Sequence, residues 1–206
     1  VARRAEPVTS GVCLPRGACR ADQPFALFDG ETEIPLQSAP LVVGRDGGLR
    51  WVLLDFQVDV GAKETRRLVL KTRPPVARPA AAIQVDEDDD ALAVDTGALR
   101  LAIAKRKPFA LFDALRAQGG PDLRGGAVEA VEAKTGLRLR AGEPKRVVLE
   151  YRGPLRVTAR VEGAYEPVPD ALPAGGAAPR LGYVTRITAW AGRSDVLVQH
   201  ILANSN

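Results

Sequence analysis

The stretch that most constrains the fold is Gly44–Val60, where a glycine-rich polar turn leads into the longest alternating run of the chain. Side chains alternate across a β-strand with a period of two. Val52 and Leu54 therefore share one face, while Trp51 and Asp55 belong to the other. The pattern predicts a strand buried on both faces at its start, with Trp51 in the core, and on one face at its end. It favours an all-β domain.

Sixteen prolines and twenty glycines interrupt the 206 residues at intervals typical of short strands and turns. A chain of this length forms one large β domain or two small ones. The sequence predicts about a dozen strands and at most one short helix, with Ala127–Lys134 ambiguous between helix and strand. No apolar run approaches the roughly 20 residues of a membrane-spanning helix, so no membrane span is expected.

The net charge of +4 suggests two classes of acidic partner, nucleic acid and anionic polysaccharide. The sequence has no basic block and no interleaved aromatic platform, so nucleic acid is not predicted as a partner. Single arginines stand among apolar residues and are interpreted as solvent-facing strand positions: Arg100, Arg156, Arg160 and Arg186.

The hexapeptide Pro-Phe-Ala-Leu-Phe-Asp occurs twice, at Pro24–Asp29 and at Pro108–Asp113, and holds four of the five phenylalanines. The repeat predicts a duplicated β unit in which each phenylalanine pair fills an equivalent core position. Two halves, roughly residues 11–85 and 92–203, would then form one β-barrel without exposed sheet edges. The alternative is that the hexapeptide is simply a good buried strand that ends in a turn aspartate.

Candidates for catalysis and metal binding are weak. His200 is the sole histidine and lies in an apolar alternation, which favours a hydrogen-bonded core residue over a catalytic base. The acidic run Asp86–Asp90 offers carboxylates to Ca²⁺, yet it lacks the glycine and distal glutamate of an EF-hand loop. A solvated hairpin tip is the favoured interpretation. No catalytic residue, metal or cofactor is therefore predicted.

The best binding candidate is the segment around Trp190. An exposed tryptophan stacks on sugar rings, and Arg193 and Asp195 can hydrogen-bond hydroxyls or carboxylates. Trp190, Arg193 and Asp195 are therefore the predicted substrate-binding residues. The alternative is an Arg–Asp pair that braces the turn.

Two features suggest export. The chain has no methionine, so we expect that Val1 is not a translation start and that a segment has been removed. Cys13 and Cys19 can close a small disulfide loop, consistent with an oxidising compartment, and a free-thiol pair is the alternative. We expect a secreted or periplasmic protein, and the apolar strand just before Asn206 suggests a fragment of a longer chain.

Three parts of the sequence, Phe25–Gln37 with Pro40–Leu41, Asp46–Phe56 and Arg186–Asn204, resemble the N-terminal domain of exo-rhamnogalacturonan lyase-like proteins. The resemblance implies a RIFT barrel, a β-barrel of two related interlocked halves, as one domain over residues 1–206. It also implies that lyase chemistry belongs to later domains. Family members usually carry a tryptophan before the Asp-Gly turn and a serine after it, where this chain has glycines.

The resemblance thus predicts a non-catalytic N-terminal module of an exported rhamnogalacturonan lyase-like protein, a scaffold with glycan contacts. Its expected partners are an anionic polysaccharide and other domains of the same protein. The alternative is a stand-alone structural or assembly subunit of an extracellular complex. A third hypothesis is an independent hydrolase that uses His200.

Overall fold

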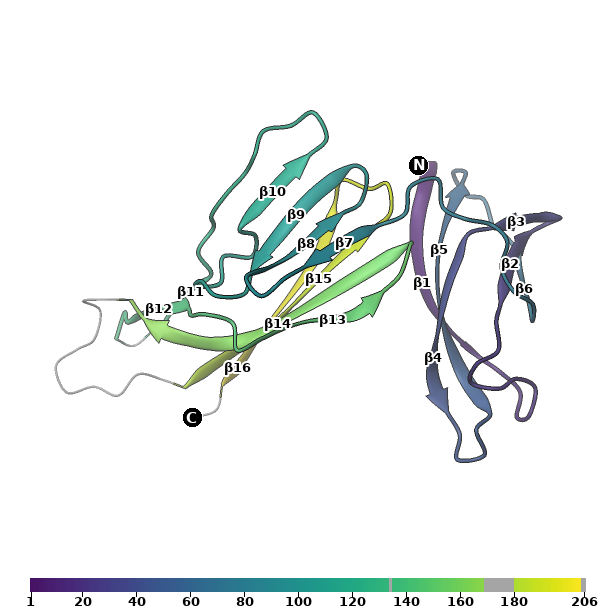
Figure 1. The fold of residues 1–206 in the computed structure, drawn as a ribbon, viewed down its shortest axis with the longest axis horizontal. Coiled ribbons are helices and arrows are strands. Elements are labelled where there is room, and N and C mark those ends of the chain that lie inside the picture. Colours follow the sequence, from purple (N-terminus) through teal and green to yellow (C-terminus); the bar gives the residue numbers. More distant parts are fainter. Residues whose placement is uncertain (134, 169–179, 205–206) are drawn as a thin grey trace. The chain divides into compact units, whose positions relative to one another are not determined.

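The computed structural model describes residues 1–133, 135–168 and 180–204. This described part contains sixteen β-strands and no helix (Figure 1), so the all-β prediction is confirmed. The described part of the ambiguous segment contributes a short strand, β11 (Glu129–Val131). The segment Pro167–Pro179, rich in proline, glycine and alanine, predicts a loop, and it lies largely outside the described residues.

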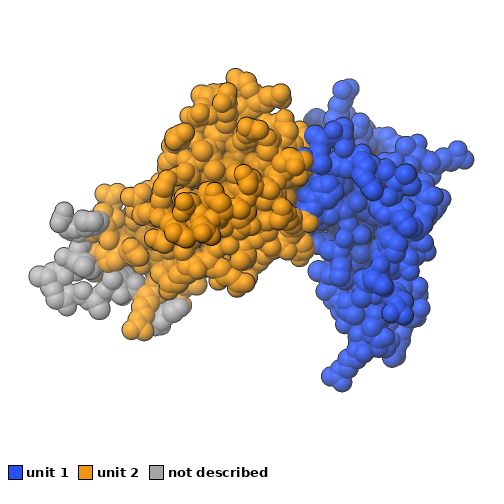
Figure 2. Space-filling model, in the orientation of Figure 1, with its two compact units in different colours: residues 1–82, 153–156 blue, residues 83–152, 157–206 orange. Residues whose placement is uncertain are grey.

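The chain divides into two compact units, shown in blue and orange in Figure 2. Unit 1 comprises residues 1–82 and 153–156, and unit 2 comprises residues 83–152 and 157–206. The single-domain organisation with two interlocked halves stays a prediction.

Unit 1 consists of two three-stranded antiparallel sheets, and hydrophobic side chains from both sheets form its core. One sheet has the order β1 (Arg3–Cys13), β5 (Leu49–Val60), β4 (Leu36–Val43). The other has the order β3 (Thr32–Ile34), β2 (Ala26–Asp29), β6 (Leu68–Lys71). The buried core residues are Cys19, Phe25, Leu27, Leu36, Leu49, Val52, Leu54 and Phe56.

The central strand β5 corrects two expectations. Trp51 is 41% exposed rather than in the core, because it lies on the face of β5 opposite the core residues Val52 and Leu54. Asp55 is only 3% exposed, although the alternation placed it on a solvated face. Its Oδ1 lies 2.9 Å from Nε of Arg156 and accepts a hydrogen bond from the hydroxyl of Thr9.

Arg156 is therefore not a solvent-facing arginine, as the sequence suggested, but a buried partner of Asp55 within unit 1. The side chain of Gln37 fixes the same segment. Its amide oxygen accepts hydrogen bonds from the backbone N–H groups of Leu155 and Arg156, at 3.1 and 2.9 Å, and its amide nitrogen donates to the carbonyl of Arg156. A segment distant in sequence thus satisfies the buried carboxylate.

Unit 2 consists of a four-stranded and a six-stranded antiparallel sheet. The first has the order β10 (Ala114–Ala117), β9 (Leu99–Ala104), β8 (Ala91–Asp95), β7 (Gln84–Glu87). The second has the order β11, β12 (Arg138–Ala141), β14 (Arg156–Pro167), β15 (Leu181–Trp190), β16 (Val196–Asn204), and β13 (Arg146–Arg152) also pairs with β14. Leu92, Ile103, Leu139, Val161 and Tyr183 are fully buried between them.

The two PFALFD copies differ in structure. In unit 1 the first copy contains β2, and both of its phenylalanines, Phe25 and Phe28, are buried. In unit 2 Phe109 is buried, but Phe112 is half-exposed and residues 108–113 form no strand. The expected equivalence of the two phenylalanine pairs is not found.

Candidate binding site

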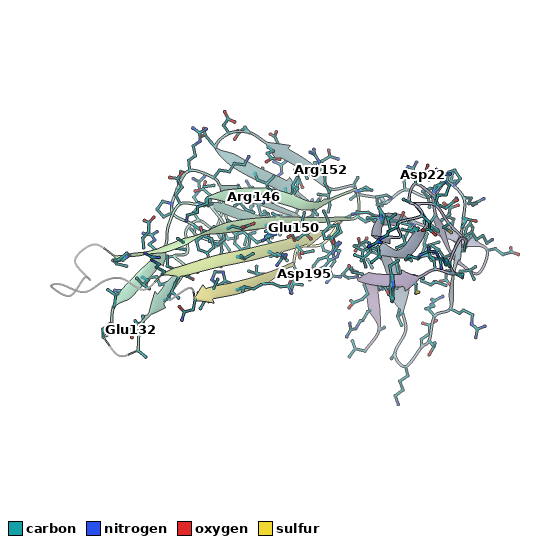
Figure 3. All side chains as sticks on the ribbon, turned by 90° about the horizontal axis from the view of Figure 1, so that it is seen from below. Asp22, Glu132, Arg146, Glu150, Arg152 and Asp195 are labelled. Atoms are coloured by element: carbon teal, nitrogen blue, oxygen red, sulfur yellow. The ribbon has the colours of Figure 1, made fainter. Side chains whose placement is uncertain are left out.

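The predicted substrate-binding residues lie at the turn between β15 and β16 of unit 2, with Asp195 labelled in Figure 3. The Nε and Nη2 groups of Arg193 donate hydrogen bonds to the two carboxylate oxygens of Asp195, at 2.7 and 3.2 Å. This bidentate bond lowers the pKa of the Asp195 carboxyl, which is therefore ionised at neutral pH. Trp190 is half-buried, and its indole N–H has no hydrogen-bond partner among the described residues.

This turn is held in place by Thr96, a fully buried residue of the β8–β9 connection. The backbone N–H of Gly192 donates to the carbonyl of Thr96 at 2.6 Å, and the Thr96 hydroxyl donates to the carbonyl of Arg193 at 2.7 Å. Gly192 has a φ of +67°, which glycine adopts without strain. The β15–β16 turn is thus fixed against the β8–β9 turn.

The β8–β9 turn carries a second Arg–Asp pair. Nε of Arg100 donates to Oδ2 of Asp95 at 2.6 Å, and the backbone N–H of Gly97 donates to Oδ1 at 2.8 Å. The Gly97 hydrogen bond, followed by that of Arg100, lowers the pKa of the Asp95 carboxyl. A pocket of about 410 Å³ opens beside this turn, between residues 95–100 of β8–β9 and residues 116–119 at the end of β10.

A larger groove of about 680 Å³ lies on the face of the β7–β10 sheet opposite its core. The antiparallel register places Gln84, Asp95, Arg100 and Arg116 side by side across four strands, a set we call the polar row. The next row on the same face is Asp86, Ala93, Ala102 and Ala114, and we call its three alanines the alanine floor. Both rows line the groove.

The sequence predicts a strand over Gly97–Lys105 with Leu99, Leu101 and Ile103 on one face and Arg100 and Ala102 on the other, and the structure confirms this alternation. The sequence does not identify the groove, because a row across four strands depends on the pairing register of each neighbouring strand. The detectable signal was the recurrence of alanine at alternate positions in consecutive short strands.

His200 is hydrogen-bonded as predicted, but it is exposed rather than part of the core. Its Nε2 lies 2.9 Å from the hydroxyl of Tyr165, and its Nδ1 lies 2.7 Å from the hydroxyl of Thr185. Desolvation lowers the pKa of the imidazole, so the neutral ring is favoured at pH 7. Both ring nitrogens are therefore engaged by structural partners.

The acidic run forms the tip of the β7–β8 hairpin, as predicted. The carboxylate of Asp88 accepts hydrogen bonds from the backbone N–H groups of Asp90 and Ala91, both at 2.8 Å, and these bonds lower its pKa. The residues described by the structure contain no group of three or more histidine, cysteine, aspartate or glutamate side chains suited to a metal ion. Cys13 is an exposed free cysteine and Cys19 a buried one.

Residues 2–70 match the family model of the PcRGLX-like N-terminal RIFT barrel domain. This match confirms the resemblance for the N-terminal third of the chain, which lies within unit 1. A search of curated proteins found no match to the chain. Among the described residues, no helix has the length and apolar character needed to cross a membrane.

Proposed function

We propose that this chain is a non-catalytic β module of an exported rhamnogalacturonan lyase-like protein, and that it contacts the glycan through Trp190, Arg193 and Asp195. The observation that carries the proposal is the bidentate Arg193–Asp195 pair on a turn fixed by buried Thr96. A planar donor and acceptor pair on the turn that follows Trp190 suits the hydroxyls and carboxylates of a uronate-containing saccharide. The match to the RIFT barrel domain supports the family setting.

We assign the bond-breaking chemistry to other domains of the same protein. Cleavage of a uronate chain by β-elimination needs a base and a group that neutralises the carboxylate. His200 is the natural candidate for the base, but its two nitrogens are bonded to Tyr165 and Thr185. The role proposed for this module is therefore to support the protein and to hold the glycan.

Calorimetric titration of the full chain with soluble pectic fragments tests this proposal. Trp190→Ala and Arg193→Ala should each weaken binding at least about tenfold while the protein stays folded. Arg106→Ala is the matched control, because Arg106 is an exposed arginine that pairs with aspartates at the tip of the β7–β8 hairpin. Unchanged affinity in both site variants would remove Trp190, Arg193 and Asp195 as the binding site.

A second candidate function, an assembly subunit of an extracellular complex, is supported by β16. This strand ends the order of the six-stranded sheet, so one of its edges has no neighbouring strand in the described part of the chain. Leu197, Ile201 and Leu202 on β16 are 48%, 49% and 55% exposed. Exposed apolar side chains on an edge strand favour association with another chain.

Size-exclusion chromatography at micromolar concentration separates the two functions. The assembly function predicts a stable oligomer that Ile201→Lys disrupts, whereas a monomer would count against it. Ile201 lies outside the proposed glycan contacts, so the same variant should leave glycan binding unchanged.

A further inference from the structure

We propose that β16 is a dimerisation strand, and that the β16 strands of two copies of this chain pair antiparallel along their outer edges about a two-fold axis at Gln199. The inference rests on the assembly function proposed above and names its partner, a second copy of this chain. All the residues that carry it belong to unit 2.

The composition of β16 differs from that of the other strands at sheet edges. Natural edge strands are protected from pairing with another chain by charged side chains or prolines. Within the residues described by the structure, every other edge strand carries such a residue: Arg3, Arg4, Glu6 and Pro7 in β1, Glu33 in β3, Pro40 in β4, Lys71 in β6, Asp86 and Glu87 in β7, Arg116 in β10, Glu129 in β11, and Arg146, Glu150 and Arg152 in β13. The nine residues of β16 include no proline, lysine, arginine, aspartate or glutamate, so this edge is open to pairing.

The exposed apolar side chains of β16 lie on both faces of the sheet. Leu197 and Ile201 are on one face, whereas Leu202 is on the other. Leu202 is 55% exposed, although its neighbour on β15, Tyr183, is 1% exposed, so burial on this face is lost at the last strand. A molecule bound to one face would leave the other uncovered, whereas a strand added at the edge contacts side chains on both faces.

The sequence of β16 is self-complementary when the two-fold axis lies at Gln199. Antiparallel pairing about this residue places Leu197 opposite Ile201 of the second copy on one face. On the other face it places Leu202 opposite Val196 of the second copy. The two-fold symmetry repeats each contact, so every exposed apolar side chain of β16 meets an apolar side chain.

The neighbouring registers lack this match. Opposite residues of an antiparallel pair share a face, so the axis can move only from one residue to the next. An axis at His200 would place Ile201 opposite Gln199 and the two imidazole rings against each other. An axis at Val198 would place Ile201 opposite Asp195. The register about Gln199 is therefore the one that pairs apolar residues with each other.

The polar side chains at the centre of β16 are compatible with this pairing. His200 would lie opposite Val198 of the second copy, and its ring nitrogens are already bonded to Tyr165 and Thr185 within its own chain. Covering the ring therefore leaves neither nitrogen without a partner. The two Gln199 amides would meet at the axis, where each offers a donor and an acceptor to the other. Pairing thus buries apolar surface without leaving these polar groups unsatisfied.

Disulfide trapping in the full chain tests the register. A Cys13→Ser background removes the exposed free cysteine, and Gln199→Cys in this background should form a disulfide-linked dimer under mild oxidation. Opposite Cα atoms of an antiparallel pair lie about 4.5–5.5 Å apart, which a disulfide can span. Ala203→Cys is the matched control, because Ala203 is exposed on the same face but would lie about 27 Å from its equivalent in the second copy. Non-reducing electrophoresis measures the dimer, and no cross-linking of Gln199→Cys, or equal cross-linking of both variants, would overturn the proposal.

A pair of charged substitutions at exposed positions tests the same register without a covalent bond. Ile201→Lys should weaken the dimer about tenfold or more, because the ammonium group would face Leu197 of the second copy. Adding Leu197→Glu to the same chain should recover much of the affinity, since the two charges then meet across the axis but lie about 14 Å apart within one strand. Sedimentation equilibrium gives the dissociation constants. A double variant that dimerises no better than Ile201→Lys alone would overturn the pairing about Gln199.

The outcomes also separate this inference from the functions proposed above. An oligomer on size-exclusion chromatography without a Gln199→Cys cross-link would retain the assembly function and overturn the β16 pairing. A monomer would overturn the pairing and count against the assembly function as well. The titrations of Trp190→Ala and Arg193→Ala test the glycan contacts separately, since neither residue lies on β16.

Discussion

Residues Pro24–Asp29 of unit 1 and Pro108–Asp113 of unit 2 share one sequence, yet only the first copy contains a regular strand. The first copy pairs with β3 on one side and with β6 on the other, so its backbone is satisfied by two continuous neighbours. In the second copy the N–H of Phe109 donates to Gly142 and that of Asp113 donates to Ala102. Partners in two different strands or turns force the backbone to bend between them.

The bend is visible at Leu111, whose φ is +60°. This left-handed conformation costs a residue other than glycine roughly 1–2 kcal/mol. Its counterpart, Leu27, lies in the middle of β2 and is 3% exposed. The backbone conformation of these six residues is therefore set by their hydrogen-bond partners rather than by an intrinsic preference. A sequence repeat is for this reason weak support for a structural repeat.

The largest expected effect is common to both copies. Phe25 and Phe109 are each 2% exposed, and Phe109 stacks on Tyr183 at a ring distance of 5.2 Å. We expect Phe25→Ala and Phe109→Ala to destabilise their own units by about 3–5 kcal/mol each. Urea denaturation followed by Trp51 in a Trp190→Phe background, or by Trp190 in a Trp51→Phe background, reports on unit 1 and unit 2 respectively.

A decrease of less than about 1 kcal/mol in the free energy of unfolding would show that the substituted phenylalanine does not fill the core of its unit. The two copies would then differ even at their most buried position. A matched control is Phe→Leu at each position, which keeps most of the apolar volume and should cost clearly less.

Substitution of the equivalent leucines should change the free energy of unfolding by different amounts in the two copies. Leu27→Gly removes a buried side chain from a strand and should destabilise unit 1 by about 3–5 kcal/mol. Leu111→Gly removes a half-exposed side chain but relieves the left-handed backbone, so the net change should be less than about 1 kcal/mol. Equal losses in the two variants, measured by the same two fluorescence reporters, would show that the backbone difference has no energetic consequence.

The outer phenylalanines should differ by a smaller amount. Phe28 has Nζ of Lys71 at 4.1 Å from its ring centroid and the guanidinium carbon of Arg73 at 4.9 Å, and these cation–π contacts contribute about 0.5–1 kcal/mol each. Phe28→Leu should therefore cost about 1–2 kcal/mol, and Phe112→Leu less than that. Lys71→Met in the Phe28→Leu background checks the mechanism, because its effect should largely disappear there.

Only unit 2 should lose stability in mild acid through its aromatic cluster. Phe109 stacks on Tyr183, and Tyr183 lies 6.1 Å from the ring of His200, whose pKa is lowered in the folded state by desolvation. The stabilisation is complete above the unfolded-state pKa of about 6.5 and decreases as the pH falls below it. In a Trp51→Phe background, thermal melting at pH 7.5 and 5.5 read by Trp190 should show this decrease when His200 is present and a smaller one in His200→Gln.

The smallest effect belongs to the terminal aspartates. Asp29 pairs with Arg66 at 2.9 Å, and Asp113 pairs with Lys107 at 3.2 Å, both near the surface. Exposed ion pairs contribute about 0–1 kcal/mol, so Asp29→Asn and Asp113→Asn should each change the free energy of unfolding by less than about 1 kcal/mol. A larger loss at either position would indicate a role in the turn that ion pairing does not explain.

Much of the local structure was predictable from alternation. The strand character of β5 and β9, the β7–β8 hairpin and the all-β class follow from a period of two and from turn residues. The burial of Asp55 was not predictable, because its partner Arg156 lies about a hundred residues further along the chain. The exposure of Trp51 depends likewise on which face of the sheet is packed against the core, which no local pattern records.

For the candidate binding site, the sequence placed Trp190, Arg193 and Asp195 around a turn, and the structure adds the buried Thr96 that fixes this turn. The groove of unit 2 could not be predicted from the sequence, since each of its two rows combines one residue from each of four strands. No spacing along the chain records that combination.

The sequence by itself determined which residues alternate, where the chain turns and that the protein is built from strands, because these properties depend on side chains a few positions apart. Only the tertiary structure decided which strands pair and in which register, and so which copy of PFALFD becomes β2 and which arginines meet over the alanine floor. The physical reason is that backbone hydrogen bonds between strands join residues distant in sequence, and a shift of one residue exchanges the two faces of a strand.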